Sequence, residues 1–458
     1  MTADSAWGAA CLLPTLLVFS LALWTRRPIE SLLSGSLLGL LMLHGSGFVG
    51  GLAAVSLRVL TDEDVAWVIL VCGLMGGLIG LLLRTGASAA FTRWLEPRVR
   101  SARQALHASW LLGIALFVDD YLNSLAVGAA MRGITDRLHI AREKLAYVVD
   151  STAAPVSVII PYSTWGAFFG GLLVANGLAA PEERLNVYIS AIPYMFYAWA
   201  AVLLVPLVIS GLVPSLGAMA RADARVRESG ATVPPGAEHI EAANRSIVPR
   251  EGLEAPLWLF LLPMLGVVVA TMLADNDFLV GIYCALGATI TVVLALRMLD
   301  LRDTFDTVID GFKTMLEPLA VLVAAFMLNE VNVELGLAGY VVAQLQPLLS
   351  AELLPVAVFL SMGLLSFLTG SNWGVFVIVL PIVATLGRNL EADMTLLIGA
   401  TLSASTFGSH ACFYSDATVL TAQASGCTAL QHALTQLPYA LIAAALSAVA
   451  YLAMGMAG

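Results

Sequence analysis

Charged residues are scarce in this sequence. Of its 458 residues, 12% are Asp, Glu, Lys or Arg and 59% are apolar, whereas an average soluble protein has roughly 25% charged residues. The basic residues are scattered over short segments, so the net charge of −10 comes without a basic surface for nucleic acid. We therefore expect no nucleic-acid partner.

The sequence also has few cysteines and lacks common catalytic patterns. Its five cysteines are isolated, mostly within apolar runs, and form no CxxC or CxxH pair. Neither a zinc site nor a disulfide framework is indicated. HExxH, GxSxG and cysteine–histidine patterns are absent as well. We therefore expect neither an enzyme nor a bound cofactor.

Long apolar runs take the place of these features. Several reach the roughly 20 residues that a helix needs to cross a bilayer. The first run has no basic segment before it and is followed by Arg26 and Arg27, so it is interpreted as a retained helix rather than a signal peptide. With the short loops, the runs predict a multi-pass protein in the lipid of a bacterial inner membrane. They cover residues 10–24, 65–83, 188–212, 256–273, 278–296, 353–367 and 437–454.

The distribution of arginine and lysine predicts the topology, because these residues gather in short cytoplasmic loops. Arg26 and Arg27 place the first helix end inside, and the acidic residues 61–64 fit outside. The loops 84–103 and 132–144 are both basic, so both belong inside. A re-entrant hairpin over residues 104–131 reconciles them, since irregular backbone is tolerated at that depth where it lines a cavity.

The first half, residues 1–214, ends with a crossing helix that is broken in the middle. This helix spans 145–174 and is interrupted at Pro155 and at 160–166. A polar segment, 215–252, follows with five arginines, and we expect it to be a cytoplasmic linker that is in part disordered.

The second half, residues 253–458, repeats this plan upside down. The pairs Tyr162-Ser163 and Tyr414-Ser415 lie 252 positions apart, each at a predicted helix break. Paired interruptions indicate an inverted-repeat transporter. The fold class is an all-α polytopic membrane protein with about five transmembrane helices and one re-entrant hairpin in each half. The second-half elements are helices 255–274, 278–297 and 312–331, a hairpin 352–388, a broken helix 394–425 and a final helix 436–456.

Polar residues at the two hairpin tips and two helix breaks form the candidate ion- or substrate-binding site. A carboxylate inside an apolar run is costly unless it faces a cavity, a partner or a cation, and Asp119 and Asp120 lie in such a run. Tentative sodium ligands are Asp119, Asp120, Asn123, Ser163 and Asp416. The whole candidate set is Asp119, Asp120, Asn123, Ser124, Asp150, Ser151, Thr152, Ser163, Thr164, Thr369, Ser371, Asn372, Ser405, Thr406, Ser409, His410, Ser415 and Asp416.

Structural roles compete with these assignments. One of Asp119 and Asp120 can be capped by backbone N–H groups or paired with an arginine, leaving the other for the cargo. Membrane serines and threonines often bond to their own backbone, and His410 is either a proton group or a structural hydrogen-bonder. Interpreted as loop, boundary or interface residues are Asp62–Asp64, Asn329–Glu334, His44, His107, His139, His239 and His432.

Five motifs resemble the NhaC-type sodium/proton antiporters. They are Asp119-Asp-Tyr-Leu-Asn-Ser124, Arg142-Glu-Lys-Leu-Ala-Tyr-Val-Val-Asp-Ser-Thr-Ala-Ala-Pro155, Ser163-Thr-Trp-Gly166, Thr369-Gly-Ser-Asn-Trp-Gly374 and Thr435-Gln-Leu-Pro-Tyr-Ala440. The resemblance implies paired hairpins, a homodimer built on scaffold domains, and an elevator movement of the transport domains that carry the hairpins. It also implies Na+ and protons as the coupled ions.

The second helix break departs from the family pattern. Gly408-Ser-His410 replaces Gly-Asp-His, Cys412-Phe413 replaces Ser-Pro, and Ser415-Asp-Ala-Thr418 replaces Ser-Asp-Thr-Thr. Two hypotheses follow: sodium/proton exchange through the buried aspartates, including Asp150, or Na+- or H+-coupled transport of an amino acid or other small carboxylate. Two broken repeats favour alternating access over a channel. The second tip carries no carboxylate, so the first half is the expected cation site.

Overall fold

The computed structural model describes residues 7–25, 27–244, 246–345, 350–370 and 373–457. Within these ranges every regular element is a helix, so the predicted all-α class is confirmed. The predicted site residues Ser371 and Asn372 lie outside the described ranges.

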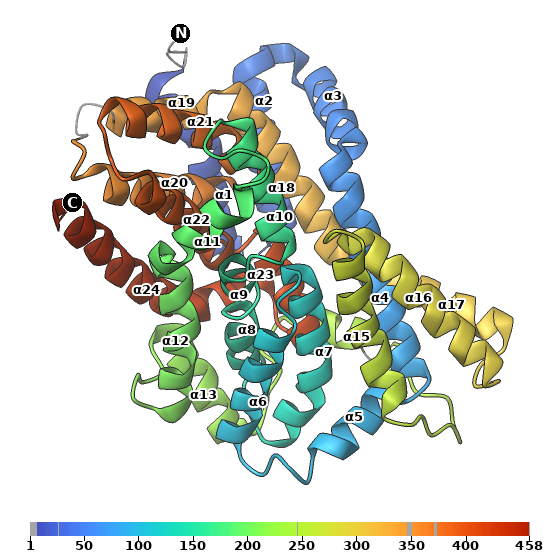
Figure 1. Cartoon of the computed structure of the whole chain (residues 1–458). Helices are drawn as coiled ribbons and strands as arrows, with labels where there is room; N and C mark the ends of the chain where they lie inside the picture. The colour runs from blue at the N-terminus through green and yellow to red at the C-terminus, as the bar shows by residue number, and fades with distance from the viewer. Residues whose placement is uncertain (1–6, 26, 245, 346–349, 371–372, 458) are drawn as a thin grey trace.

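The described part of the first half contains twelve α-helices, of which α6–α10 carry the candidate site (Figure 1). Its α-helices are α1 (Leu13–Thr25), α2 (Pro28–His44), α3 (Phe48–Thr61), α4 (Glu63–Arg84), α5 (Ala87–Leu95), α6 (Ala102–Ala115), α7 (Asp120–Arg137), α8 (Arg142–Asp150), α9 (Ala154–Ile159), α10 (Thr164–Ala175), α11 (Arg184–Ala191) and α12 (Phe196–Ser210). Three short 3₁₀ turns are η1 (Gly8–Leu12), η2 (Gly45–Gly47) and η3 (Ile192–Tyr194).

The second half follows two linker helices and ends in the longest α-helix of the described chain. The linker holds α13 (Gly217–Ser229) and α14 (Glu238–Asn244). The later helices are α15 (Trp258–Leu273), α16 (Phe278–Ala295), α17 (Leu301–Lys313), α18 (Leu316–Glu334), α19 (Leu337–Leu345), α20 (Leu354–Thr369), α21 (Trp373–Asn389), α22 (Met394–Ala411), α23 (Asp416–Ser425) and α24 (Ala429–Ala457).

The order of helices in the second half repeats that of the first. The segments Arg142–Ile159 and Met394–Ala411 begin and end 252 positions apart (142 to 394), and each continues into a bent second piece. The nine-residue helices α5 and α19 begin and end 250 positions apart (87 to 337). The predicted repeat thus has a counterpart in the helix bounds, while its inversion across a membrane stays a prediction.

The helices suit a membrane by length and composition. Among the described residues, six helices are long and apolar enough to cross a bilayer, and the number rises to nine if each bent pair is one span. Large apolar side chains also lie on the surface, with Trp24 and Leu273 both 82% exposed. Such a surface suits lipid better than water, which supports the predicted multi-pass membrane protein.

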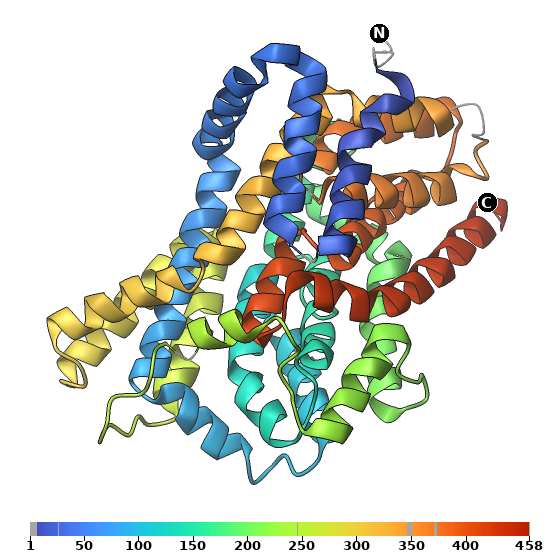
Figure 2. The same ribbon diagram turned by 180° about the vertical axis from the view of Figure 1, so that it is seen from behind.

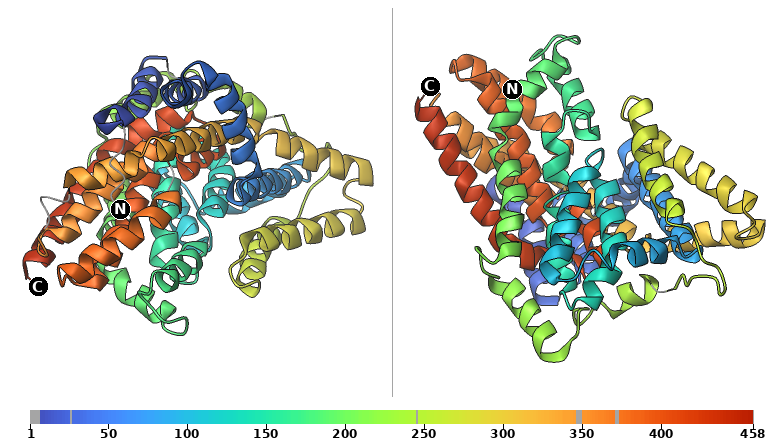
Figure 3. Two further views of the ribbon diagram at one scale, coloured as in Figure 1. Left: turned by 90° about the horizontal axis from the view of Figure 1, so that it is seen from above. Right: turned by 60° about the horizontal axis from the view of Figure 1, so that its bottom comes forward.

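Helices α4 and α17 cross in close backbone contact because glycines lie where they meet. A Cβ atom added to Gly311 would lie 2.2 Å from the carbonyl oxygen of Gly76. Small residues allow this close approach between membrane helices. Helices α15, α16 and α17 lie together at one side of the molecule, with α4 between them and the remaining helices (Figure 1, Figure 2, Figure 3).

Two parts of the linker are helical, α13 and α14, because charged residues at the start of α8 hold both helices. Arg225 donates two hydrogen bonds of 2.7 Å to Glu143, and Lys144 donates one of 2.5 Å to Asp223. Arg142 is 1% exposed and donates to Glu241 at 3.1 Å. Buried ion pairs with good geometry fix a segment whose composition alone suggests a flexible chain.

Two further bounds differ from the sequence prediction. Helix α24 begins at Ala429 rather than at 436, because its first turns are polar and bury Thr435 and Gln436 inside the protein. Helix α18 begins at Leu316 and not at 312, since α17 ends at Lys313 and the chain turns there. Hydropathy marks the lipid-facing part of a helix and misses its polar, protein-facing ends.

Candidate functional site

The α6–α7 turn is hydrogen-bonded to the break between α9 and α10. The backbone N–H of Thr164 donates to the carbonyl of Val118 at 2.9 Å, and the Ser157 hydroxyl donates to the carbonyl of Phe117 at 3.0 Å. The chain bends by 41° at this break. Loop carbonyls that lack helical partners are thus satisfied inside the protein.

The end of α20 is connected in a similar way to the break between α22 and α23. The Tyr414 hydroxyl donates to the carbonyl of Leu368 at 2.5 Å, and the bend here is 40°. Gly370 ends α20 at φ +64°, where an added Cβ would lie 2.3 Å from the Tyr414 ring. Glycine is needed for both the left-handed conformation and the close approach.

Asp119 is the N-cap of α7. Its Oδ1 accepts hydrogen bonds from the backbone N–H groups of Tyr121 at 2.9 Å and Leu122 at 3.0 Å. Its Oδ2 accepts one from the Thr164 hydroxyl at 2.9 Å. This side chain therefore fills the capping role that the sequence left open for one of the two adjacent aspartates.

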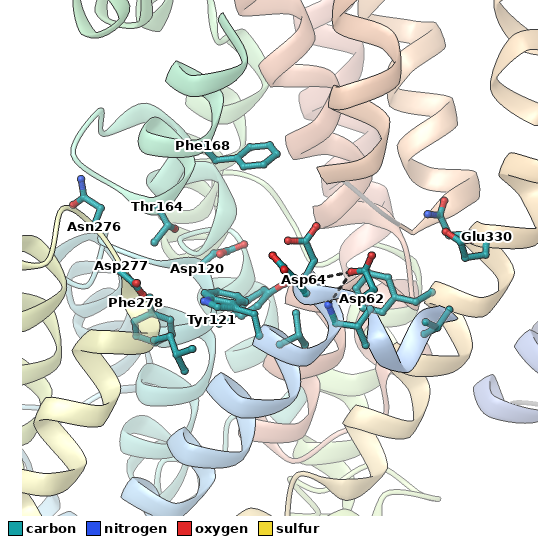
Figure 4. Close-up of a pocket in the computed structure, with 18 of the residues that line it drawn as sticks. Asp62, Asp64, Asp120, Tyr121, Thr164, Phe168, Asn276, Asp277, Phe278 and Glu330 are labelled. Carbon is teal, nitrogen blue, oxygen red and sulfur yellow. Dashed lines mark hydrogen bonds between the residues drawn. The ribbon is translucent and has the colours of Figure 1, made fainter. Parts of the chain in front are cut away.

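Asp120, the first residue of α7, lies at a cavity. Its side chain is 2% exposed and lines a cavity of 690 Å³ together with Tyr121 and Thr164. Figure 4 shows these residues below Phe168, with Asp64 facing them. The two neighbouring aspartates thus have different surroundings: Asp119 accepts three hydrogen bonds within the fold, whereas Asp120 interacts with Trp165 and also faces the cavity.

Asp416, the first residue of α23, belongs to the same cluster. Its Oδ2 accepts a hydrogen bond of 2.6 Å from the Tyr121 hydroxyl, and the carboxyl group interacts electrostatically with Asp119 and Asp120. All three carboxyl groups are at most 5% exposed. No arginine, lysine or histidine within the described ranges forms an ion pair with any of them. Buried like charges of this kind need protons or a cation from outside the chain.

The cavity is acidic and aromatic, and the sequence did not identify most of its lining. Asp62–Asp64 are exposed, as expected for a solvated segment, and they also line the cavity, with Asp62 capping α4. Asp277 and Glu330 also line it (Figure 4). The cavity is lined by Arg58, Val59, Asp62, Glu63, Asp64, Val65, Trp67, Val68, Asp120, Tyr121, Thr164, Phe168, Asn276, Asp277, Phe278, Leu279, Phe326, Asn329 and Glu330.

Asp150 lies in a separate buried network with His432. Its Oδ2 accepts hydrogen bonds from His432 Nε2 at 2.9 Å, Gln436 Nε2 at 2.7 Å and the Thr418 hydroxyl at 3.3 Å. The interpretation of His432 as a loop or interface residue is therefore wrong, since its side chain is completely buried. Nothing in the sequence around His432 indicates that its side chain pairs with Asp150.

His410 is held by hydroxyl groups on both sides of its ring. Nε2 lies 3.0 Å from the Ser151 hydroxyl and Nδ1 lies 2.7 Å from the Tyr197 hydroxyl. This favours the structural alternative, because both ring nitrogens already have partners.

The other predicted residues are buried but mostly serve the fold. Asn123 donates to the carbonyls of Gly113 at 2.6 Å and Thr152 at 2.7 Å, and its Oδ1 has no partner. Ser163 and Ser415 each donate to the carbonyl six positions earlier, at 2.6 Å and 2.5 Å. Ser124 accepts a hydrogen bond from Thr421 of α23, and Thr152 and Thr406 donate to backbone carbonyls four positions earlier. The buried hydroxyl groups of Ser405 and Ser409 have no hydrogen-bond partner.

The tentative sodium ligands therefore do not form one shell. The Ser163 hydroxyl is used by Ser157 and Gly166, and Asn123 bonds to backbone carbonyls. Thr369 lines a small cavity beside Asp416 and Tyr414. Among the described residues, no group of three or more His, Cys, Asp or Glu side chains is placed to hold a metal ion. Of the tentative sodium ligands, Asp120 is the one that lines the large cavity.

Comparison with known proteins supports the resemblance drawn from the motifs. An uncharacterized protein of Haemophilus influenzae is 27% identical to this chain, over 99% of this chain and 91% of the relative. The sequence model of the Na+/H+ antiporter family matches residues 167–456, which include the second helix break and Asp416. The chain therefore belongs to the Na+/H+ antiporter family.

Proposed function

We propose that the protein exchanges sodium ions for protons at the Asp119–Asp120–Asp416 cluster, with Asp120 as the group that alternates between the two. The observation that carries this proposal is the cluster itself: three buried carboxyl groups without a cationic side chain beside them in the described chain. Burying a carboxylate without a compensating charge costs on the order of several kcal/mol of free energy, because the ion loses its hydration. A proton or a sodium ion removes that cost.

Exchange follows from competition for one carboxyl group. When Asp120 carries a proton it cannot coordinate sodium, and when sodium is bound the proton has left. The cavity gives Asp120 access to ions, and other acidic residues in its lining, such as Asp64 and Asp277, raise the local concentration of cations. Asp416 and Tyr121 supply further oxygen atoms, the ligand type that sodium prefers.

Alternating access is proposed to follow the family pattern. The helix bounds that recur about 250 positions apart support an inverted repeat with two re-entrant hairpins, α6–α7 and α20–α21. On this proposal the hairpins and broken helices form the moving transport domain, while the remaining helices form a scaffold that dimerises in the bacterial inner membrane. Helix breaks suit this role because they free backbone groups at membrane depth.

A carboxylate cargo receives no support from the cavity. Its one basic side chain is Arg58, which lies 3.6 Å from Glu330 and also bonds to Glu334. An anionic solute would face at least five carboxyl groups in the lining, and like charges repel strongly in a partly buried site. The alternative hypothesis of carboxylate transport is therefore not the one that this site favours.

Purified protein in liposomes with a trapped pH dye tests the proposal. External sodium is expected to dissipate an imposed pH gradient, and Asp120→Asn is expected to stop this while leaving the protein folded. The matched control is Asp306→Asn on α17, whose carboxyl group is exposed and pairs with Arg302 at 3.6 Å. The proposal is abandoned if sodium has no effect on the wild type, or if Asp120→Asn exchanges as fast as the control.

A further inference from the structure

The same cavity is far larger than a sodium ion requires. Its 690 Å³ lies in the range of about 300–1,000 Å³ typical of sites for small organic molecules. Its lining includes the buried Asp120 and the exposed residues Asp62 and Asp277. The volume and the chemistry of its walls together indicate what else it can hold.

Aromatic rings line the cavity on more than one side. The Trp67 ring lies 5.7 Å from the Tyr121 ring and 6.3 Å from the Phe278 ring, measured between centroids. Phe168 and Phe326 complete the lining from α10 and α18. Figure 4 shows Phe168 above Asp120, with Tyr121 and Phe278 on the opposite side. Aromatic faces attract cations, most strongly when the cation is an organic ammonium group that also contacts the rings through its carbon atoms.

The charge of the cavity lining also favours organic ammonium ions. The carboxyl groups of Glu63, Asp64 and Asp120 line the cavity, and no basic side chain in the described residues pairs with any of the three. Asp120 is 2% exposed, so it would act as a desolvated counter-ion. A cation with an apolar body fits both parts of this lining, whereas an anion or a neutral polar solute fits neither.

We propose that this cavity binds organic ammonium ions, with Asp120 as counter-ion and Trp67, Tyr121, Phe168 and Phe278 around the apolar body. The proposal rests on the proposed cation site, because the two ligands share Asp120. Organic ammonium ions and sodium therefore compete, and a protonated amine is a second cargo class for the exchanger.

Isothermal titration of the full-length protein in detergent at pH 7, in potassium chloride without sodium, tests the proposal with three isosteric probes. Benzylammonium is expected to bind saturably, while benzyl alcohol and benzoate are not. Sodium is expected to raise the apparent dissociation constant of benzylammonium. Equal binding of benzylammonium and benzyl alcohol, or no saturable binding of benzylammonium, overturns the proposal.

Variants locate the binding. Trp67→Leu is expected to weaken benzylammonium binding roughly 3- to 30-fold, the size of a cation–π contribution, and Phe168→Leu serves the same purpose if the first variant does not fold. The matched control is Trp24→Leu, which removes an 82% exposed ring elsewhere on the surface. Unchanged affinity in a folded Trp67→Leu or Phe168→Leu variant contradicts the placement.

The two proposals fail separately. Sodium/proton exchange in liposomes without benzylammonium binding overturns the organic-cation site alone. Benzylammonium binding that depends on Trp67, in a protein that shows no sodium/proton exchange, overturns the proposed exchange of inorganic cations and leaves the binding site in place.

Discussion

The adjacent aspartates offer a sharp test, because the structure gives them different roles. Replacing Asp119 by alanine removes the cap of α7, which is worth about 1 kcal/mol, and the hydrogen bond from Thr164 to a charged acceptor, worth about 2 kcal/mol. Replacing Asp120 by alanine removes the interaction of its carboxyl group with the Trp165 side chain, which is worth about 1 kcal/mol. Either change relieves repulsion among the three carboxyl groups, so that contribution is shared by both variants.

We therefore expect the free energy of unfolding of Asp119→Ala to be about 2 kcal/mol lower than that of Asp120→Ala. Equilibrium unfolding in mixed detergent micelles, followed by tryptophan fluorescence, measures the difference. Asp119→Asn keeps an oxygen acceptor for the two backbone N–H groups and is expected to recover at least the capping part. If Asp120→Ala is as unstable as Asp119→Ala, or if Asp119→Asn recovers nothing, the assignment of the cap is wrong.

Three other changes test separate parts of the site. Tyr121→Phe removes the hydroxyl that donates to Asp416 at 2.6 Å, and we expect the sodium concentration for half-maximal exchange in liposomes to shift at least threefold; an unchanged value contradicts a role for this bond. His432→Ala leaves the buried Asp150 short of a partner and is expected to cost about 1–3 kcal/mol in the same unfolding assay, with His432→Gln less affected. Gly311→Val places a branched side chain against the backbone of α4, so we expect a lower melting temperature, measured by size-exclusion chromatography after heating. An unchanged melting temperature refutes the close crossing of α4 and α17.

The sequence was most informative where composition and spacing have a direct physical consequence. Apolar runs predicted the helical membrane protein, and the polar breaks at 160–166 and 407–416 coincide with bends in the described chain. The pair Asp119-Asp120 was identified because carboxylates are expensive in an apolar run. These features depend on neighbours along the chain, which a single sequence contains.

Contacts between segments that are distant in the sequence could not be predicted from the sequence alone. Nothing near His432 in the sequence indicates that it meets Asp150, and nothing near Tyr121 indicates that it meets Asp416. Residues 62–64 appeared to be an ordinary acidic loop, since only the fold brings Phe168 and Phe278 to the same cavity. The two linker helices have no signal in the nearby sequence because their partners, Glu143 and Lys144, lie more than 70 residues away.

The surroundings of the three carboxyl groups explain why one of them, rather than all three, would respond to an external cation. Asp119 receives two backbone N–H groups and a hydroxyl, and Asp416 receives the Tyr121 hydroxyl together with the N–H of Ala417. These donors favour the charged form of both groups. Asp120 receives fewer donors, since its carboxyl group interacts with the Trp165 side chain and its own backbone N–H, and it alone of the three faces the large cavity. Its charge therefore depends on what enters from solution, and because Tyr121 connects α7 to α23, an ion that binds there acts on a contact between the two halves of the chain.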